Sequence, residues 1–93
     1  MRVLLYAKDD CGLCDAFHFE LLDLQSELGF VYEKRHLAAG DPLLAELAGH
    51  FPVVDLETPS TADPIRLTSP TDQRQLRARI RELAVLALSA QGS

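Results

Sequence analysis

The pattern of apolar and polar positions predicts a strand followed by a helix at the start of the chain. Residues 2–7 form a continuous apolar run, which is typical of a short strand covered on both faces. Apolar residues then recur at helical spacing, with charged residues between them, until Gly29, where we expect the helix to end. The apolar positions of this helix are Cys14, Phe17, Leu21, Leu24 and Leu28.

The middle of the chain predicts a strand, a short helix and another strand. Residues 30–37 begin with β-branched and aromatic residues, which favour a strand. Asp41 followed by Pro42 is typical of a helix start, because aspartate caps free amides and proline fits the first helical position. We expect this helix to end at Gly49. Residues 51–56 predict a third strand that begins near a proline, where proline is tolerated.

The last third of the chain predicts a short strand and a long helix. A loop rich in proline, serine and threonine at residues 57–64 precedes residues 65–67, a candidate fourth strand. We expect Ser69 to cap the last helix, with Pro70 in its first turn and Asp72 reaching back in a capping box. The apolar face of this helix comprises Leu76, Ile80, Leu83 and Ala87.

This order of elements predicts an α/β fold, βαβαββα, with a mixed sheet. A strand–helix–strand unit pairs its strands in parallel, and we expect the last two strands to pair antiparallel. Helices should cover both faces of the sheet. A chain of 93 residues has the size of one domain. We place this domain at residues 1–88 and expect residues 89–93 to form a frayed tail.

Composition and charge exclude several classes of protein. The chain is 47% apolar and 25% charged, with a net charge of −5, so it lacks the basic face that nucleic-acid binding requires. No apolar stretch approaches the roughly 20 residues of a membrane span. Lys8, Asp9 and Asp10 end the first apolar run too early for a signal peptide. We therefore expect a cytoplasmic monomer without a nucleic-acid or membrane partner.

The candidate chemistry lies in the two cysteines of the chain, Cys11 and Cys14, between the first strand and the first helix. Unpaired amides and the helix dipole stabilise a thiolate at such a position, and the thiolate is the form that attacks disulfides. The spacing also suits closure of a small disulfide ring. In a reducing compartment such a pair is more often catalytic or metal-binding than structural. A redox dithiol is the favoured interpretation, with a metal site or two inert thiols as alternatives.

The histidines provide the metal alternative. His18 lies four residues after Cys14, so Cys11, Cys14 and His18 are three candidate zinc ligands, with His36 or His50 as a fourth. Nothing in the sequence brings His36 or His50 to the dithiol. An iron–sulfur cluster shared between two chains is a further metal alternative. We expect no metal ligands in the favoured interpretation.

Three segments together resemble the glutaredoxin-like branch of the thioredoxin superfamily. They are Cys11-Gly12-Leu13-Cys14, Asp41-Pro42-Leu43-Leu44 and Phe51-Pro52-Val53-Val54. The resemblance extends to about Leu88 and implies a thioredoxin-like fold, a four-stranded mixed sheet flanked by three helices. It implies that Pro52 is cis and faces the dithiol, and that the backbone before Pro52, at Phe51, offers hydrogen bonds to a bound thiol substrate.

The chemistry then follows from where the sulfurs sit. Cys11, at the exposed helix start, should attack a substrate disulfide, and Cys14, one turn inside, should resolve the mixed disulfide. No cofactor is then needed. The substrates expected from the resemblance are protein or glutathione disulfides. A non-catalytic thioredoxin-fold binding module or a metal carrier is the alternative function.

The resemblance also implies substrate contacts at Lys8 and Asp72. Glutaredoxins often carry a lysine at the place of Lys8, where it assists the thiolate and binds a carboxylate of glutathione. Asp72 stands where an aspartate binds the amino group of glutathione. The chain departs from the family because it lacks the glycine pair before the last helix. Asp9, Asp10 and Asp15 also place negative charge near the dithiol, which opposes the thiolate.

Overall fold

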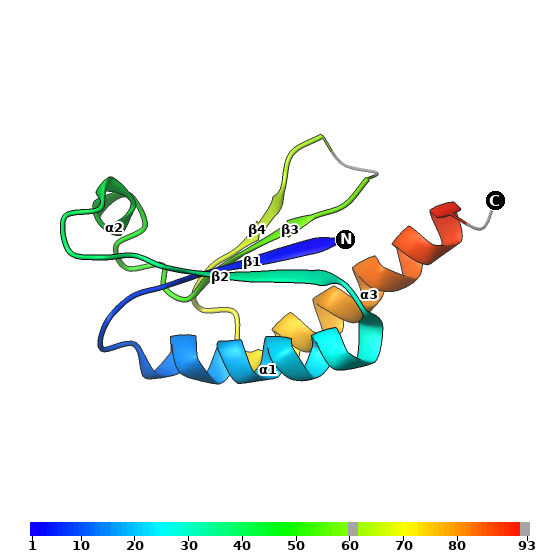
Figure 1. Ribbon diagram of the computed structural model, residues 1–93, viewed down its shortest axis with the longest axis horizontal. Coiled ribbons are helices and arrows are strands. Elements are labelled where there is room, and N and C mark those ends of the chain that lie inside the picture. The colour runs from blue at the N-terminus through cyan, green and yellow to red at the C-terminus, as the bar shows by residue number, and fades with distance from the viewer. Residues whose placement is uncertain (60–61, 92–93) are drawn as a thin grey trace.

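The computed structural model describes residues 1–59 and 62–91, and within the last helix it describes side chains up to Leu86. The elements follow the order β1 (Arg2–Ala7), α1 (Gly12–Leu28), β2 (Val31–His36), α2 (Pro42–Glu46), β3 (Val53–Glu57), β4 (Ile65–Leu67) and α3 (Gln73–Gln91) (Figure 1). This order confirms the predicted α/β arrangement, βαβαββα, and it is consistent with a thioredoxin-like fold. Among the described residues, no helix is both long and apolar enough to span a membrane.

The four strands form one mixed sheet in the order β2-β1-β3-β4. β1 pairs in parallel with β2, because α1 carries the chain back to the start of the sheet between them. β3 pairs antiparallel with both β1 and β4. Both predicted pairings are confirmed. This order places β1 between two neighbours, so the loop that carries the two cysteines leaves the sheet from the end of an inner strand.

One face of the sheet packs against α1 and α3, which lie side by side along it (Figure 1). Val3 and Leu5 of β1 and Val54 and Leu56 of β3 point into this core. The helices contribute Phe17, Leu21, Leu24, Leu76, Ile80 and Leu83. The predicted apolar faces of both long helices are confirmed at these positions, whereas the side chain of Ala87 lies outside the described residues.

The opposite face of the sheet carries the third helix, α2, as expected, but the cover is narrow (Figure 1). A smaller apolar cluster lies on this side, formed by Leu4, Tyr6, Leu37, Leu47 and Val53. α2 contributes only partly buried leucines, Leu43 and Leu44, to the edge of this cluster. The helix has five residues, too few to extend along the strands, and it lies toward the end of the sheet where β1 and β2 finish (Figure 1). The expected cover on both faces is therefore narrow on this side.

The start of α3 differs from the prediction. Ser69 and Pro70 do not begin the helix; they belong to the preceding loop, and the bond between them is cis. Asp72 is the cap instead. Its carboxylate accepts the amide of Gln75 at 2.8 Å, and the side chain of Gln75 accepts the amide of Asp72 at 2.9 Å. The observed box is therefore shifted by three residues from the predicted one: Asp72 replaces Ser69 as the cap, and Gln75 reaches back in the place expected of Asp72.

The ends of the other helices follow the sequence more closely. Gly29 ends α1 in a left-handed conformation, at φ 75°, and its amide donates to the carbonyl of Gln25. The side chain of Asp41 accepts the amide of Leu43 at 2.9 Å and caps α2 as predicted. α2 itself ends at Glu46, before the expected stop at Gly49. α3 extends to Gln91.

Candidate active site

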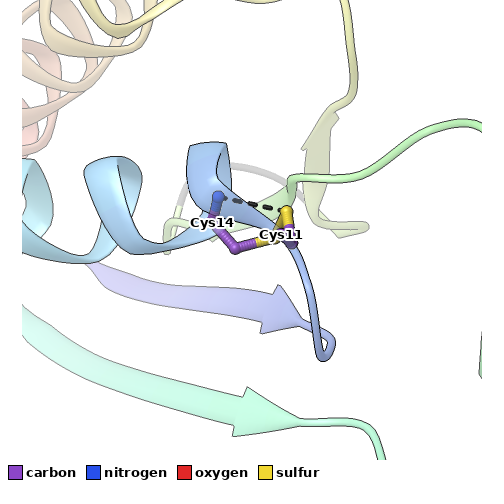
Figure 2. The surroundings of a disulfide bond; sticks show 2 residues. All are labelled: Cys11 and Cys14. Carbon is purple, nitrogen blue, oxygen red and sulfur yellow. Dashed lines mark hydrogen bonds between the residues drawn. A yellow bond between two sulfur atoms is a disulfide. The ribbon is translucent and has the colours of Figure 1, made fainter.

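Cys11 and Cys14 form a disulfide at the start of α1 (Figure 2). Their Cα atoms are 5.2 Å apart, which is ordinary for a disulfide. No other cysteine occurs in the chain. The predicted intramolecular pair is therefore confirmed as a bond that this fold accommodates.

The two cysteines differ in burial and in their place on the helix. Cys11 is the N-cap of α1, has an extended backbone and is partly exposed. Cys14 is buried to 1% exposure and lies one turn inside, on the same face as Phe17. Leu13 between them is 61% exposed. A substrate disulfide can therefore approach Cys11 more readily than Cys14.

The backbone at the start of α1 favours negative charge on Cys11. The sulfur of Cys11 accepts a hydrogen bond from the amide of Cys14 at 3.1 Å, drawn as the dashed line in Figure 2. The first amides of a helix lack partners within it, and they form the positive end of its dipole. When the disulfide is reduced, this position stabilises a thiolate at Cys11. The carboxylates of Asp9, Asp10 and Asp15, which line a cavity together with Cys11, oppose that charge.

One cavity, of about 570 Å³, lies against the apolar side of the dithiol loop. Its apolar wall is formed by Leu13 and Phe17 of α1 and by Pro52. The Phe51–Pro52 bond is cis, which confirms the isomer that the family resemblance implied. The remaining wall comprises Ser69, Pro70, Thr71, Asp72, Gln73 and Arg74. The structure therefore brings Pro52 and Asp72, both predicted as substrate contacts, to a single cavity that Leu13, between the two cysteines, also lines.

A second cavity, of about 370 Å³, opens on the Cys11 side and is rich in charge. Its charged residues are Lys8, Asp9, Asp10, Asp15, Lys34 and His36. We call it the charged cavity, and Cys11 itself lines it. His36 Nε2 lies 2.8 Å from Asp9 Oδ1, so these two side chains already partner each other. Asp10 adopts a left-handed conformation at φ 57°, which aspartate tolerates better than most residues do.

Lys8 and Phe51, also predicted as substrate contacts, touch each other. The Lys8 ammonium lies 5.7 Å from the centre of the Phe51 ring, a cation–π distance. Phe51 is partly buried against the cluster that contains Leu4 and Tyr6. The contact links the loop before the dithiol to the residue before Pro52. Sequence reasoning did not find it, because the two loops are far apart in the chain.

The histidines are placed differently from what the sequence suggested. His18 Nδ1 lies 2.8 Å from the hydroxyl of Tyr32, on the β2 side of α1. His36 lines the charged cavity with Cys11, although the sequence gave no reason to place it there. The signal was in the parallel register, which sets His36 opposite Ala7. In the part of the chain that the structure describes, no group of three or more histidine, cysteine or acidic side chains is arranged to hold a metal ion.

Comparison with known proteins places these features in a family. A family model for the Glutaredoxin-like domain (DUF836) matches residues 2–81, which include β1, the dithiol, the Pro52 loop and much of α3. The chain belongs to this family. As a glutaredoxin-like protein it also shares its fold with a solved chain described as "Structure of a malarial protein", at a TM-score of 0.65 and 21% identity. That likeness covers 87% of the present chain and 93% of the other. No curated protein matches the glutaredoxin-like chain.

Proposed function

We propose that this glutaredoxin-like protein is a thiol–disulfide oxidoreductase, in which Cys11 attacks a substrate disulfide and Cys14 resolves the mixed disulfide. The observation that carries the proposal is the unequal placement of two sulfurs that are close enough to bond. Cys11 caps α1 and is accessible, whereas Cys14 is buried behind it. A pair of inert thiols would not need this asymmetry, and it matches the two successive roles of exchange chemistry.

The reaction balances as two successive sulfur exchanges. The Cys11 thiolate attacks one sulfur of a substrate disulfide, forms a new bond to it and releases the other sulfur as a thiolate, which takes a proton from water. Cys14 then loses its proton and attacks Cys11, which releases the second substrate thiolate. The substrate gains two electrons and two protons, and the protein reaches the Cys11–Cys14 disulfide seen in the structure. Thiols such as glutathione reverse the exchange and restore the dithiol.

The substrates proposed are protein disulfides and glutathione disulfide. The cavity beside Pro52 supports glutathione, because Asp72 and Arg74 supply opposite charges to the amino and carboxylate groups of an amino-acid moiety. The apolar wall at Leu13 and Pro52 suits the carbon atoms next to a substrate sulfur. We propose that the protein works in the cytoplasm as a monomer and needs no bound cofactor, since the exchange involves only sulfur atoms and protons.

A trapping experiment tests the proposed function. The reduced Cys14→Ser variant should react with oxidised glutathione and stall as an adduct on Cys11, detected as added mass that a reductant removes. The matched Cys11→Ser variant should form little adduct, since the buried sulfur of Cys14 lacks access. Equal adduct formation by the two variants would contradict the assignment of roles. Purification of the parent protein with stoichiometric zinc or iron on both thiols would instead favour a metal carrier.

A further inference from the structure

Lys8 stands among carboxylates without pairing to one. It shares the charged cavity with Asp9, Asp10 and Asp15, which are its sequence or spatial neighbours. An ammonium beside three carboxylates would ordinarily form an ion pair. Ion pairs in the described residues include one between Asp9 and His36, but none that involves Lys8. The observed contact of the ammonium is the ring of Phe51, at 5.7 Å.

The ring of Phe51 is a fixed support, while the Lys8 side chain is long and rotatable. Phe51 is partly buried against the apolar cluster under α2, which fixes the position of the ring. The face of an aromatic ring attracts a cation, and the carbon chain of lysine packs on apolar surface. An ammonium held in this way is not screened by a direct carboxylate partner. Lys8 lines the same cavity as Cys11.

On these grounds, and resting on the proposed function, we propose that Phe51 is a positioning residue for the reaction. Its ring holds the Lys8 ammonium beside Cys11 and out of ion pairs with the surrounding aspartates. Phe51 therefore influences the charge around the Cys11 sulfur by positioning Lys8. This role is in addition to any backbone contact between Phe51 and substrate. Held in this position, the ammonium of Lys8 offsets the negative charge that Asp9, Asp10 and Asp15 bring to the dithiol.

The test is a double-mutant cycle on the reactivity of Cys11. Phe51→Leu removes the ring and keeps an apolar side chain, and Lys8→Met removes the charge and keeps the stem. Both are made singly and together in the Cys14→Ser background, and the rate of alkylation of Cys11 is followed against pH. Asp9, Asp10, Asp15, Lys34 and His36 also face the cavity and are the same in every variant.

We expect Phe51→Leu to slow alkylation near neutral pH by about two- to fivefold, the range of an exposed cation–π contact. The pH midpoint of the reaction should move up by about 0.3 to 0.7 unit, which corresponds to the same fold-change. Phe51→Tyr, which keeps the ring, should restore parent behaviour. In the Lys8→Met background, Phe51→Leu should have no further effect on either quantity.

Phe51→Leu also removes packing, so the stability of each variant is measured by thermal unfolding. A purely structural role would lower stability and reactivity by the same amounts in both backgrounds, because packing loss does not depend on the charge of Lys8. Additive effects of the two substitutions on the midpoint, or no effect of Phe51→Leu in the parent, would overturn the proposal. Failure of Cys11 to react with any disulfide would refute the proposed function instead, and the alkylation cycle would still measure the coupling.

Discussion

The face of the sheet under α1 and α3 differs in kind from the face on the α2 side. The first is an apolar core, with Leu5, Leu21 and Ile80 fully buried. The second carries ion pairs: Arg2 contacts Glu33 and Glu57, and Arg66 contacts Asp55. Exposed ion pairs contribute little to stability, whereas apolar burial contributes most of it. The helix that bears the dithiol therefore rests on the face that holds the fold together.

The α2 side of the sheet, which we call the charged face, contains a charged residue that is buried. Asp55 is 5% exposed, and Arg66 donates to both its carboxylate oxygens, at 2.7 and 2.8 Å. The guanidinium groups of Arg66 and Arg35 lie 5.6 and 5.9 Å from the ring centre of Tyr6. Asp55 occupies this face because side chains alternate along a strand, and its neighbours Val54 and Leu56 face the helices. The comparison thus predicts different costs for substitutions on the two faces.

The largest loss of stability is expected for Ile80→Ala in the apolar core. Ile80 is fully buried between α3 and the sheet, so the truncation removes apolar contacts and leaves a cavity. We expect the free energy of unfolding to fall by about 2–5 kcal/mol, measured by denaturant titration. Arg79→Ala, one residue away, is the control and should change little, because it removes only a partly exposed side chain that pairs with Glu82. Equal losses for the two variants would place the core elsewhere.

A smaller loss is expected for Arg66→Met on the charged face. The substitution leaves the buried carboxylate of Asp55 without its two hydrogen bonds, at a cost of about 1–3 kcal/mol. Half the Arg66 side chain is exposed, so water can reach the site, and the loss should stay below that of a fully buried pair. The double variant Asp55→Asn with Arg66→Met should recover part of the stability. No recovery would mean that Arg66 acts by packing on Tyr6.

The chain has two tyrosines, one on each face of the sheet, so their titration allows the two faces to be compared. Burial raises the pKa of Tyr32, on the helix-covered face, to about 12. Burial and the Asp55 carboxylate also raise the pKa of Tyr6, but the guanidinium groups of Arg66 and Arg35 oppose that shift. Tyr32 should therefore ionise at the higher pH, as followed by tyrosinate absorbance in Tyr6→Phe and Tyr32→Phe.

The same shift makes stability depend on pH. The fold favours the neutral phenol of Tyr32, so its contribution is complete below the ordinary pKa of about 10 and is lost as pH rises toward 12. The free energy of unfolding should fall across this window, and it should fall less steeply in Tyr32→Phe. An identical pH dependence in the variant and the parent would contradict the assignment.

The smallest effect is expected for Arg2→Ala. Arg2 bridges Glu33 and Glu57 at the exposed edge of the charged face, where water and salt screen the pairs. Stability should decrease slightly at low ionic strength and should match the parent at high salt. A loss that persists in high salt would show that this edge is held by packing.

The fold was predictable where local periodicity decides it. The apolar faces of α1 and α3 and the strand at β1 could be predicted because spacing alone shows which side chains face the core. The start of α3 could not, since the chain offers overlapping cap signals at Ser69 and Asp72. Only the partner of Asp72, the side chain of Gln75, decides between them.

The site residues that belong to a sequence motif could be predicted. Those that reach the site only through the pairing register of the strands could not. Cys11 and Cys14 could be identified from their spacing at a predicted helix start. His36 reaches the charged cavity only because β1 and β2 pair in parallel with Ala7 opposite His36. The contact between Lys8 and Phe51 joins two loops whose distance depends on the whole sheet. Such non-local pairings have no signature in the local pattern of residues.

The sulfur atom of Cys11 has two roles: it caps α1, and in the proposed function it reacts with the substrate. Because the amide of Cys14 donates to Cys11 Sγ at 3.1 Å, any change in the charge or bonding of that sulfur alters the hydrogen bond. The nuclear magnetic resonance of this one amide proton should therefore take a separate position for the thiolate, the mixed disulfide and the closed ring. The backbone of α1 carries its own spectroscopic indicator of the redox state, with no label attached to either cysteine.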